Sequence, residues 1–228
     1  MPTFVHDNQL RDSIIARLGQ FQRLDPPDQH LTPAAVVIGI TPHNETGSAG
    51  IFLTLRSSRL RKHAGQYALP GGKVDADESI TDAALRELSE ELGLKQQQDS
   101  VLGLLDDMPT QSGFIITPVV VWIEHRDSLN PNPDEVAGVY EIPLAELESL
   151  DLNINNESTD ANLASRVPDD HEENNNAADN EVMSLYLPTV GTTVYSPTAA
   201  IIYQFREVAI LGKSTRVAHF GQPTFAWR

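Results

Sequence analysis

Cysteine is absent from the 228 residues of this chain, and so is any apolar run long enough to cross a bilayer as a helix. Without cysteine the chain has neither disulfide bonds nor thiolate metal sites, which is typical of proteins in a reducing compartment. The first residues, MPTFVHDNQLRDS, lack the basic start and the apolar stretch of a secretory signal. We therefore expect a cytoplasmic protein without membrane contact, and leave mitochondrial and peroxisomal locations open.

Basic side chains are also scarce. The chain has 16 Lys and Arg against 32 Asp and Glu, and a formal net charge of −16. The phosphate backbone of DNA or RNA repels such a chain, so we expect a small-molecule substrate rather than a nucleic-acid partner. Much of the acidity lies in residues 151–181, whereas four basic side chains lie close together before residue 63: Arg56, Arg59, Arg61 and Lys62.

Three glutamates crowd one face of a helix predicted over residues 77–92. At about 100° per residue, Glu87, Glu90 and Glu91 share an arc of roughly 100°. The next arc is apolar and is expected to face the core: Ala84, Leu85, Leu88 and Leu92. Carboxylates at this spacing repel one another by roughly a few tenths of a kcal/mol per pair. The crowding indicates a missing countercharge, and Mg²⁺ or Mn²⁺ is the natural candidate for it. The alternative interpretation is an acidic helix face that is simply exposed to solvent.

The residues around this helix favour a metal site over a solvated face. Two glycines precede the helix, Arg86 flanks the acidic arc, and Gly93 stands where a helix would end. From Gly72 to Leu94 the chain meets the series G-x5-E-x7-R-E-U-x-E-E-x-G-U without a mismatch, where U is a bulky aliphatic residue. This series is the signature of the Nudix hydrolases, and the chain closely resembles them.

The resemblance implies both a fold and a chemistry. The fold is of the α/β class, an α/β/α sandwich in which a mixed sheet carries the helix with the glutamates. The chemistry is hydrolysis of a nucleoside diphosphate linked to another group, with Mg²⁺ or Mn²⁺ bound by Glu87, Glu90 and Glu91. Glu87 is the first candidate for the base, although family members differ in this role. Arg86 and Glu78 resemble a salt-bridged pair that orients the ligands.

The loop before the helix resembles the extension that marks the coenzyme A diphosphatase subgroup. It reads L-T-x-R-S-x-x-L-R-x-H-x-G-Q and then L-P-G-G, with Leu69 where the subgroup usually has Phe. Coenzyme A carries a diphosphate and a 3′-phosphate, which arginines grip through forked donors. A solvated basic turn, and a structural role for the histidine, are the alternatives. The resemblance implies these substrate-binding residues: Arg56, Arg61, His63, Gln66, Gly71 and Gly72.

The remaining periodicities predict one domain with additions. Residues 1–30 are expected to form an N-terminal helical extension, with its helix at 7–21, and a homodimer formed through it stays open. Residues 31–228 are expected to form the Nudix domain, with a disordered acidic insertion at about 153–182. Pro118 is expected at a bend or bulge of its strand. Strands are predicted at 34–41, 51–56, 101–105, 114–124 and 134–142, and helices at 143–150 and 196–211.

One acid outside the helix, Glu135, precedes a predicted strand in the phrase N-P-D-E-V, which also resembles the subgroup. It is a candidate for a further metal ligand or base, and a strand-edge acid is the favoured interpretation. We expect hydrolysis of coenzyme A or acyl-coenzyme A to adenosine 3′,5′-bisphosphate and (acyl-)4′-phosphopantetheine. Two alternatives stay open: hydrolysis of another nucleoside diphosphate derivative, such as ADP-ribose, NADH or a dinucleoside polyphosphate, and a catalytically silent nucleotide-binding module.

Overall fold

The computed structural model describes residues 4–24, 30–43, 47–60, 63–150, 153–156 and 181–223, with the backbone alone at 153–156. One predicted substrate-binding residue, Arg61, lies outside this part of the chain, and so do residues 157–180 of the predicted insertion. None of the described helices combines the length and the apolar character that a bilayer crossing requires.

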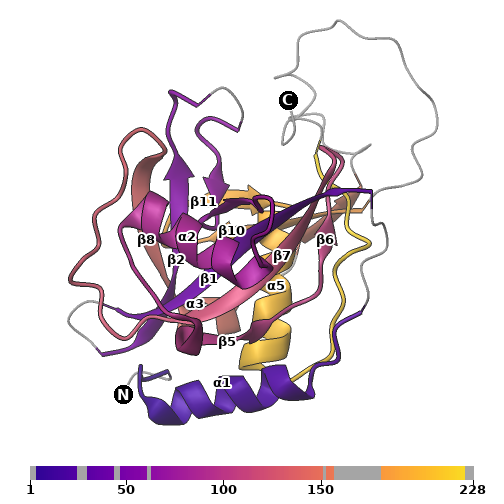
Figure 1. Ribbon diagram of the computed structural model, residues 1–228. Coiled ribbons are helices and arrows are strands. Elements are labelled where there is room, and N and C mark those ends of the chain that lie inside the picture. Colours follow the sequence, from indigo (N-terminus) through magenta and orange to yellow (C-terminus); the bar gives the residue numbers. More distant parts are fainter. Residues whose placement is uncertain are drawn as a thin grey trace, which may run out of the picture.

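A mixed eight-stranded sheet forms the centre of the protein (Figure 1). Its strands are β1 (Thr32–Pro42), β2 (Ala49–Arg56), β3 (Tyr67–Ala68), β4 (Gly71–Lys73), β5 (Val101–Leu104), β6 (Met108–Pro109), β7 (Phe114–Trp122) and β8 (Val136–Pro143). The main path runs β3–β2–β1–β7–β5, while β4, β6 and β8 pair with β1, β7 and β2 respectively. The central strands β1 and β7 are parallel, and both are near-continuous apolar runs because they are covered on both faces.

Helices cover the two faces of this sheet and bury two apolar clusters. They are α1 (Asn8–Gln20), α2 (Ile80–Leu92), η1 (Gln98–Ser100), α3 (Leu144–Glu148), α5 (Thr198–Phe205) and the π-helical turn η3 (Arg206–Ile210). Successive residues of β1 point to opposite faces, so Val37 joins the cluster under α2, whereas Ile38 joins the cluster of α1, α3 and α5. The layers therefore confirm the predicted α/β/α sandwich (Figure 1).

The N-terminal helix α1 is part of the main core. Asp7 caps its first turn, accepting a 2.9 Å hydrogen bond from the Leu10 backbone. Ile14 and Leu18 are buried in the cluster that also contains α5. The Arg17 guanidinium donates to the last carbonyl groups of η3, which lack partners within the helix. The described part of the predicted extension is thus packed against the domain, while a dimer formed through it stays a prediction.

Pro118 differs from the expectation of a bend or bulge in its strand. The pairing of β7 with β1 is continuous through Pro118, which lies opposite Val36. On the other edge of β7, β6 pairs up to Ile116 and β5 pairs from Val119 onward. Pro118 therefore sits between two partner strands, where its missing N–H is not required. The register shift in this part of the sheet lies in β5 instead.

The ends of the predicted disordered insertion are ordered strands. A second, three-stranded sheet contains β9 (Asn153–Asn156), β10 (Glu181–Leu187) and β11 (Thr192–Tyr195). The β9 backbone pairs antiparallel with residues 181–184 of β10. The two ends of the predicted insertion at about 153–182 thus pair with each other, a contact that a low-complexity composition does not reveal.

The close approach of β4 to β1 requires a glycine at position 71. A Cβ placed on Gly71 would lie 2.3 Å from the Ala35 carbonyl oxygen and 2.6 Å from the Val36 Cα. These are backbone atoms in the middle of the sheet, so they cannot move aside as a flexible side chain could. The absence of a side chain at Gly71 therefore lets β4 pair closely with β1.

We predict that Gly71→Ala lowers the free energy of unfolding by about 3 kcal/mol through this overlap. Urea denaturation followed by circular dichroism measures the change. Gly19→Ala is the matched control: no heavy atom lies within 4 Å of its Cβ position, and in helix α1 the replacement should stabilise by about 0.5 kcal/mol. Equal unfolding midpoints for the two variants would contradict the assignment.

Candidate active site

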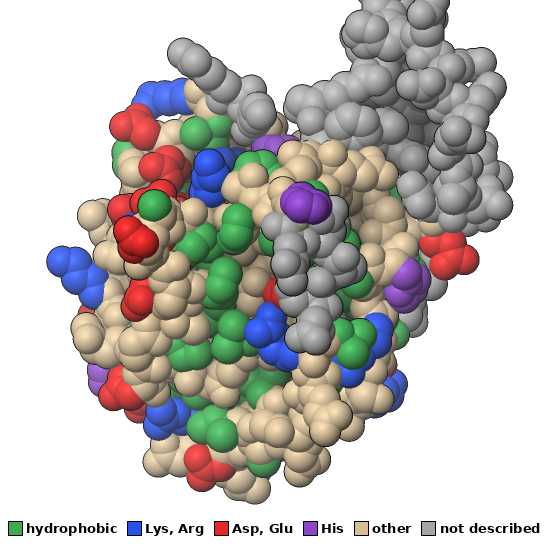
Figure 2. Space-filling view, turned by 45° about the vertical axis from the view of Figure 1, so that its right-hand side comes forward, with side chains coloured by type: hydrophobic (Ala, Val, Ile, Leu, Met, Phe, Trp, Pro, Cys, Tyr) green, Lys and Arg blue, Asp and Glu red, His purple; other side chains and the backbone are tan. Residues whose placement is uncertain are grey.

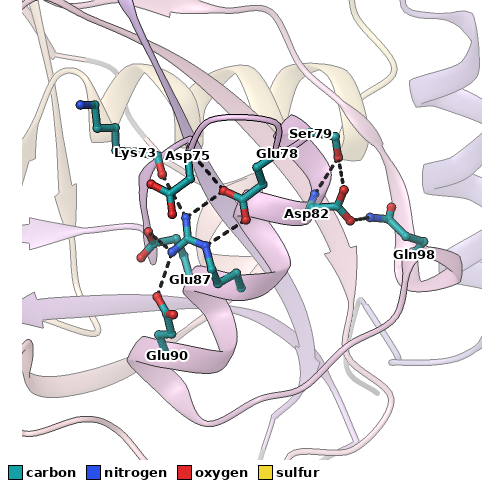
Figure 3. A network of polar contacts seen from close by, with 9 residues as sticks. Lys73, Asp75, Glu78, Ser79, Asp82, Glu87, Glu90 and Gln98 are labelled. Atoms are coloured by element: carbon teal, nitrogen blue, oxygen red, sulfur yellow. Dashed lines mark hydrogen bonds and ion pairs between the residues drawn. The ribbon is translucent and has the colours of Figure 1, made fainter.

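Helix α2 is fixed at both of its ends. Ser79 caps the N-terminus by accepting a 3.1 Å hydrogen bond from the Asp82 backbone. The Asp82 carboxylate lies at the positive end of the helix dipole and accepts a 2.6 Å hydrogen bond from Gln98 (Figure 3). Gly93 ends the helix with φ of +71°, a conformation that favours glycine. The helix thus begins three residues later than the sequence predicted.

The buried face of α2 contains one of the three crowded glutamates. As predicted, Ala84, Leu85, Leu88 and Leu92 face the core. Glu91 is buried with them, at 3% exposure, whereas the Glu90 side chain is 54% exposed. The predicted arc of glutamates therefore runs from solvent into the protein. In the space-filling view, acidic side chains gather at the left of the visible face, beside an apolar middle (Figure 2).

The Arg86 guanidinium joins the glutamates to the segment before the helix (Figure 3). Its Nε and Nη2 donate to the two carboxylate oxygens of Glu78, at 2.9 and 3.1 Å. Nη2 also donates to the Lys73 carbonyl at 3.0 Å. Nη1 donates to Glu87 and to Glu90, both at 2.8 Å. The ion pair between Glu78 and Arg86 is therefore present, and part of the countercharge that the sequence appeared to lack comes from Arg86.

The Glu87 carboxylate lies directly against the backbone of β4. A Cβ on Gly72 would lie 2.4 Å from Glu87 Oε1. A side chain at this position would displace the Glu87 carboxylate from its place beside Arg86. Gly72 is therefore a residue of the site, although the metal contact of its carbonyl that the resemblance implies stays a prediction.

Glu91, Glu87 and Glu78 differ in their affinity for protons. The pKa of Glu91 is raised to about 8, mainly by burial and also by the charges of Glu87 and Glu135, against the lowering effects of Arg56 and of a hydrogen bond from the Gly71 backbone. Burial also raises the pKa of Glu87, although Arg86 opposes the shift. The hydrogen bonds from Arg86 instead lower the pKa of Glu78. Arg56 supplies a positive charge close to Glu91, with Nη1 3.7 Å from Oε1.

The site fits a hard cation in its chemistry. Among the described residues, no three His, Asp or Glu side chains are grouped closely enough to hold a metal. The Arg86 guanidinium instead contacts both Glu87 and Glu90. The donors are nevertheless carboxylate oxygens, and Glu91 is a buried acid whose cationic partner is 3.7 Å away. Such a group is stabilised by an added positive charge.

Besides Gly71 and Gly72, the structure brings the predicted substrate residue Arg56 to the glutamates. Its Nε is buried and makes no hydrogen bond within the described structure. His63 and Gln66 belong to a turn that returns to Arg56 through a backbone hydrogen bond of 2.9 Å from Arg56 N to the Gln66 carbonyl. His63 has φ of +56°, which is uncommon for a residue with a side chain. Arg59 instead forms an exposed ion pair with Asp134 at 2.9 Å.

Glu135 lies closer to the site than the favoured interpretation of a strand-edge acid suggested. Its charge is one of the smaller causes that raise the pKa of both Glu87 and Glu91. The strand β8 begins after it, at Val136, so it is also an acid at a strand edge. The two interpretations that the sequence left open are therefore compatible.

We predict that Glu91→Gln stabilises the metal-free protein more at pH 8 than at pH 5. With a pKa of about 8, folded Glu91 keeps a proton that the unfolded chain releases near the ordinary value of 4.5. The stability that this proton contributes is complete below about pH 4.5 and is lost as the pH rises toward 8. Urea denaturation in EDTA at pH 5, 6.5 and 8 tests this. Glu90→Gln is the exposed control, and a Glu91→Gln effect independent of pH would refute the prediction.

Comparison with known proteins identifies the family. The NUDIX domain model matches residues 31–164, more than half of the chain. The Nudix hydrolase NudL of Pectobacterium atrosepticum is 45% identical over 118 residues, which cover 51% of this chain and 60% of that protein. NudL of Citrobacter koseri is 42% identical over 134 residues, covering 57% of this chain and 68% of that protein. The chain thus spans about two thirds or less of the length of these relatives.

Solved structures of related proteins are more distant. The crystal structure of a MutT/nudix family protein from Enterococcus faecalis covers 86% of this chain and 68% of that chain, with 16% identity and a TM-score of 0.48. The MutT protein of Methanosarcina mazei covers 53% of this chain and 82% of that chain, with 22% identity and a TM-score of 0.41. On the match of the family model, which includes the whole of α2 and the glycines before it, the chain belongs to the Nudix family.

Proposed function

We propose that this protein is a metal-dependent hydrolase that cleaves the diphosphate of coenzyme A or acyl-coenzyme A. The observation that carries the proposal is the set of carboxylates on α2, which runs from exposed Glu90 to buried Glu91 and faces Arg56. A buried acid short of positive charge is costly in the free protein, so it is expected where a ligand compensates it. The products would be adenosine 3′,5′-bisphosphate and (acyl-)4′-phosphopantetheine.

The carboxylates of Glu87, Glu90 and Glu91 would hold Mg²⁺ or Mn²⁺. When bound, such an ion neutralises phosphate oxygens and makes a bound water more acidic. Glu87, whose pKa burial raises, would accept the proton of the attacking water. The water oxygen would bond to one phosphorus of the diphosphate, and the bond from that phosphorus to the bridging oxygen would break. For the ion to bind, Arg86 Nη1 would have to give up its hydrogen bonds to Glu87 and Glu90. Glu78 would still hold the guanidinium in place through Nε and Nη2.

Coenzyme A is favoured over other nucleotides by the loop between β2 and α2. Arg56 precedes this loop and lies beside Glu91, and its Nε makes no hydrogen bond within the described structure. A guanidinium with a free donor suits a phosphate oxygen. The resemblance of residues 53–72 to the coenzyme A diphosphatase extension supports this substrate class. The turn into the last helix supports it less, because Val194, Tyr195 and Ser196 replace the subgroup's usual Trp-Gly version.

A substrate panel tests the proposed substrate. We expect coenzyme A to be hydrolysed with a kcat/KM at least about tenfold above those of ADP-ribose, NADH and diadenosine polyphosphates, since each lacks the combination of diphosphate and 3′-phosphate. Chromatographic separation of products with Mg²⁺ or Mn²⁺ gives the measurement. Equal turnover of all substrates would point to a hydrolase of broader specificity, and no turnover of any would support a silent nucleotide-binding module.

Replacing the glutamates tests the metal assignment. Glu90→Gln and Glu91→Gln should each lower metal-dependent kcat by at least about 100-fold, because a neutral amide binds Mg²⁺ poorly. Circular dichroism should show both variants folded. Asp12→Asn removes an exposed acid from α1 and should leave turnover unchanged. Full activity in both glutamine variants would sink the metal assignment.

A further inference from the structure

The loop between β7 and β8 is attached to the C-terminal end of α2. The last carbonyl groups of a helix have no partner within it. Here the Asn130 backbone donates to the Leu92 carbonyl and the Asn132 backbone donates to the Glu91 carbonyl, both at 2.9 Å. The helix end that carries Glu91 is thereby fixed to the residues just before Glu135.

Asn132 shapes the turn that leads to Glu135. Its carbonyl accepts hydrogen bonds from the Glu135 and Val136 backbones at 3.1 and 2.8 Å. Its side-chain Oδ1 accepts one from the Asp134 backbone at 3.1 Å, the Asx-turn geometry that asparagine favours. The remaining side-chain group, Nδ2, donates to Glu135 Oε1 at 3.3 Å. One residue therefore contacts both the helix of the metal candidates and the carboxylate of Glu135.

Glu135 is also fixed from the opposite direction. The Ser57 backbone donates to the Glu135 carbonyl at 2.8 Å. Ser57 is buried and directly follows Arg56, whose guanidinium lies near Glu91. The end of β2, the end of α2 and the start of β8 thus meet around Glu135.

We propose that Asn132 is a positioning residue for the carboxylate of Glu135, the acid outside the helix that the sequence offers as a further metal ligand. The proposal rests on the metal-dependent function proposed above. An amide suits the task because it is a neutral donor that orients one carboxylate oxygen and leaves the negative charge uncompensated. Glu78 is the contrast: Arg86 contacts both of its oxygens and neutralises it.

Asn132→Ser separates this role from the turn. A serine hydroxyl can accept the backbone hydrogen bond of the turn, but it is too short to reach the Glu135 carboxylate. We expect an unchanged unfolding midpoint in EDTA and an about tenfold weaker affinity for Mn²⁺ alone, measured by calorimetry and by electron paramagnetic resonance of free Mn²⁺. In the Glu135→Gln background the same serine replacement should change Mn²⁺ affinity less than about twofold, because no carboxylate remains to be positioned.

The outcomes separate this proposal from the proposed function. Unchanged Mn²⁺ affinity in Asn132→Ser, or an equal loss with and without Glu135, overturns the positioning role. If the protein without substitutions binds Mn²⁺ but does not hydrolyse coenzyme A, only the substrate assignment is overturned. If the protein without substitutions binds no Mn²⁺, the proposed function and the positioning role are both overturned. A lower unfolding midpoint with unchanged Mn²⁺ affinity shows that Asn132 serves the turn alone.

Discussion

The fork of hydrogen bonds from Arg86 is the interaction on which the site depends. A guanidinium carries five donors in a fixed plane, and here they reach Glu78, the Lys73 carbonyl, Glu87 and Glu90. The segment between β4 and α2 is neither helix nor strand, so its position depends on contacts with side chains. Arg86 supplies that connection and at the same time makes the crowding of carboxylates tolerable in the free protein.

The acids of the site occupy three different environments. Glu78 is matched by the guanidinium, which lowers its pKa. Glu87 lies between burial, which raises its pKa, and Arg86, which opposes the shift. Glu91 is buried with its cation 3.7 Å away, and its pKa is about 8. The same functional group is therefore suited to orientation in one place and to cation or proton binding in the others.

The fold converges on the helix from segments far apart in the sequence. Gly71 and Gly72 press β4 against β1 and leave space for Glu87. Arg56 ends β2, and Asn132 attaches the loop before β8 to the last turn of α2. Each of these contacts depends on a backbone position set by the sheet. A substitution that shifts the sheet by a fraction of an ångström would therefore alter the site without touching a glutamate.

The sequence by itself determined the helix of the glutamates, its glycine end, the Glu78–Arg86 pair and the sandwich of helices on a mixed sheet. The helix and its end are local, because periodicity and capping residues act within one segment, whereas the pair and the sandwich followed from the resemblance of the motif to a known family. Only the tertiary structure decided that Arg86 partly neutralises the acids, that Glu91 is buried, and that the insertion ends in strands. It also decided that backbone hydrogen bonds fix Glu135 and the loop before it to the ends of β2 and α2. These features depend on distances between segments that are remote along the chain, and charge, burial and strand pairing are properties of that arrangement rather than of any one stretch.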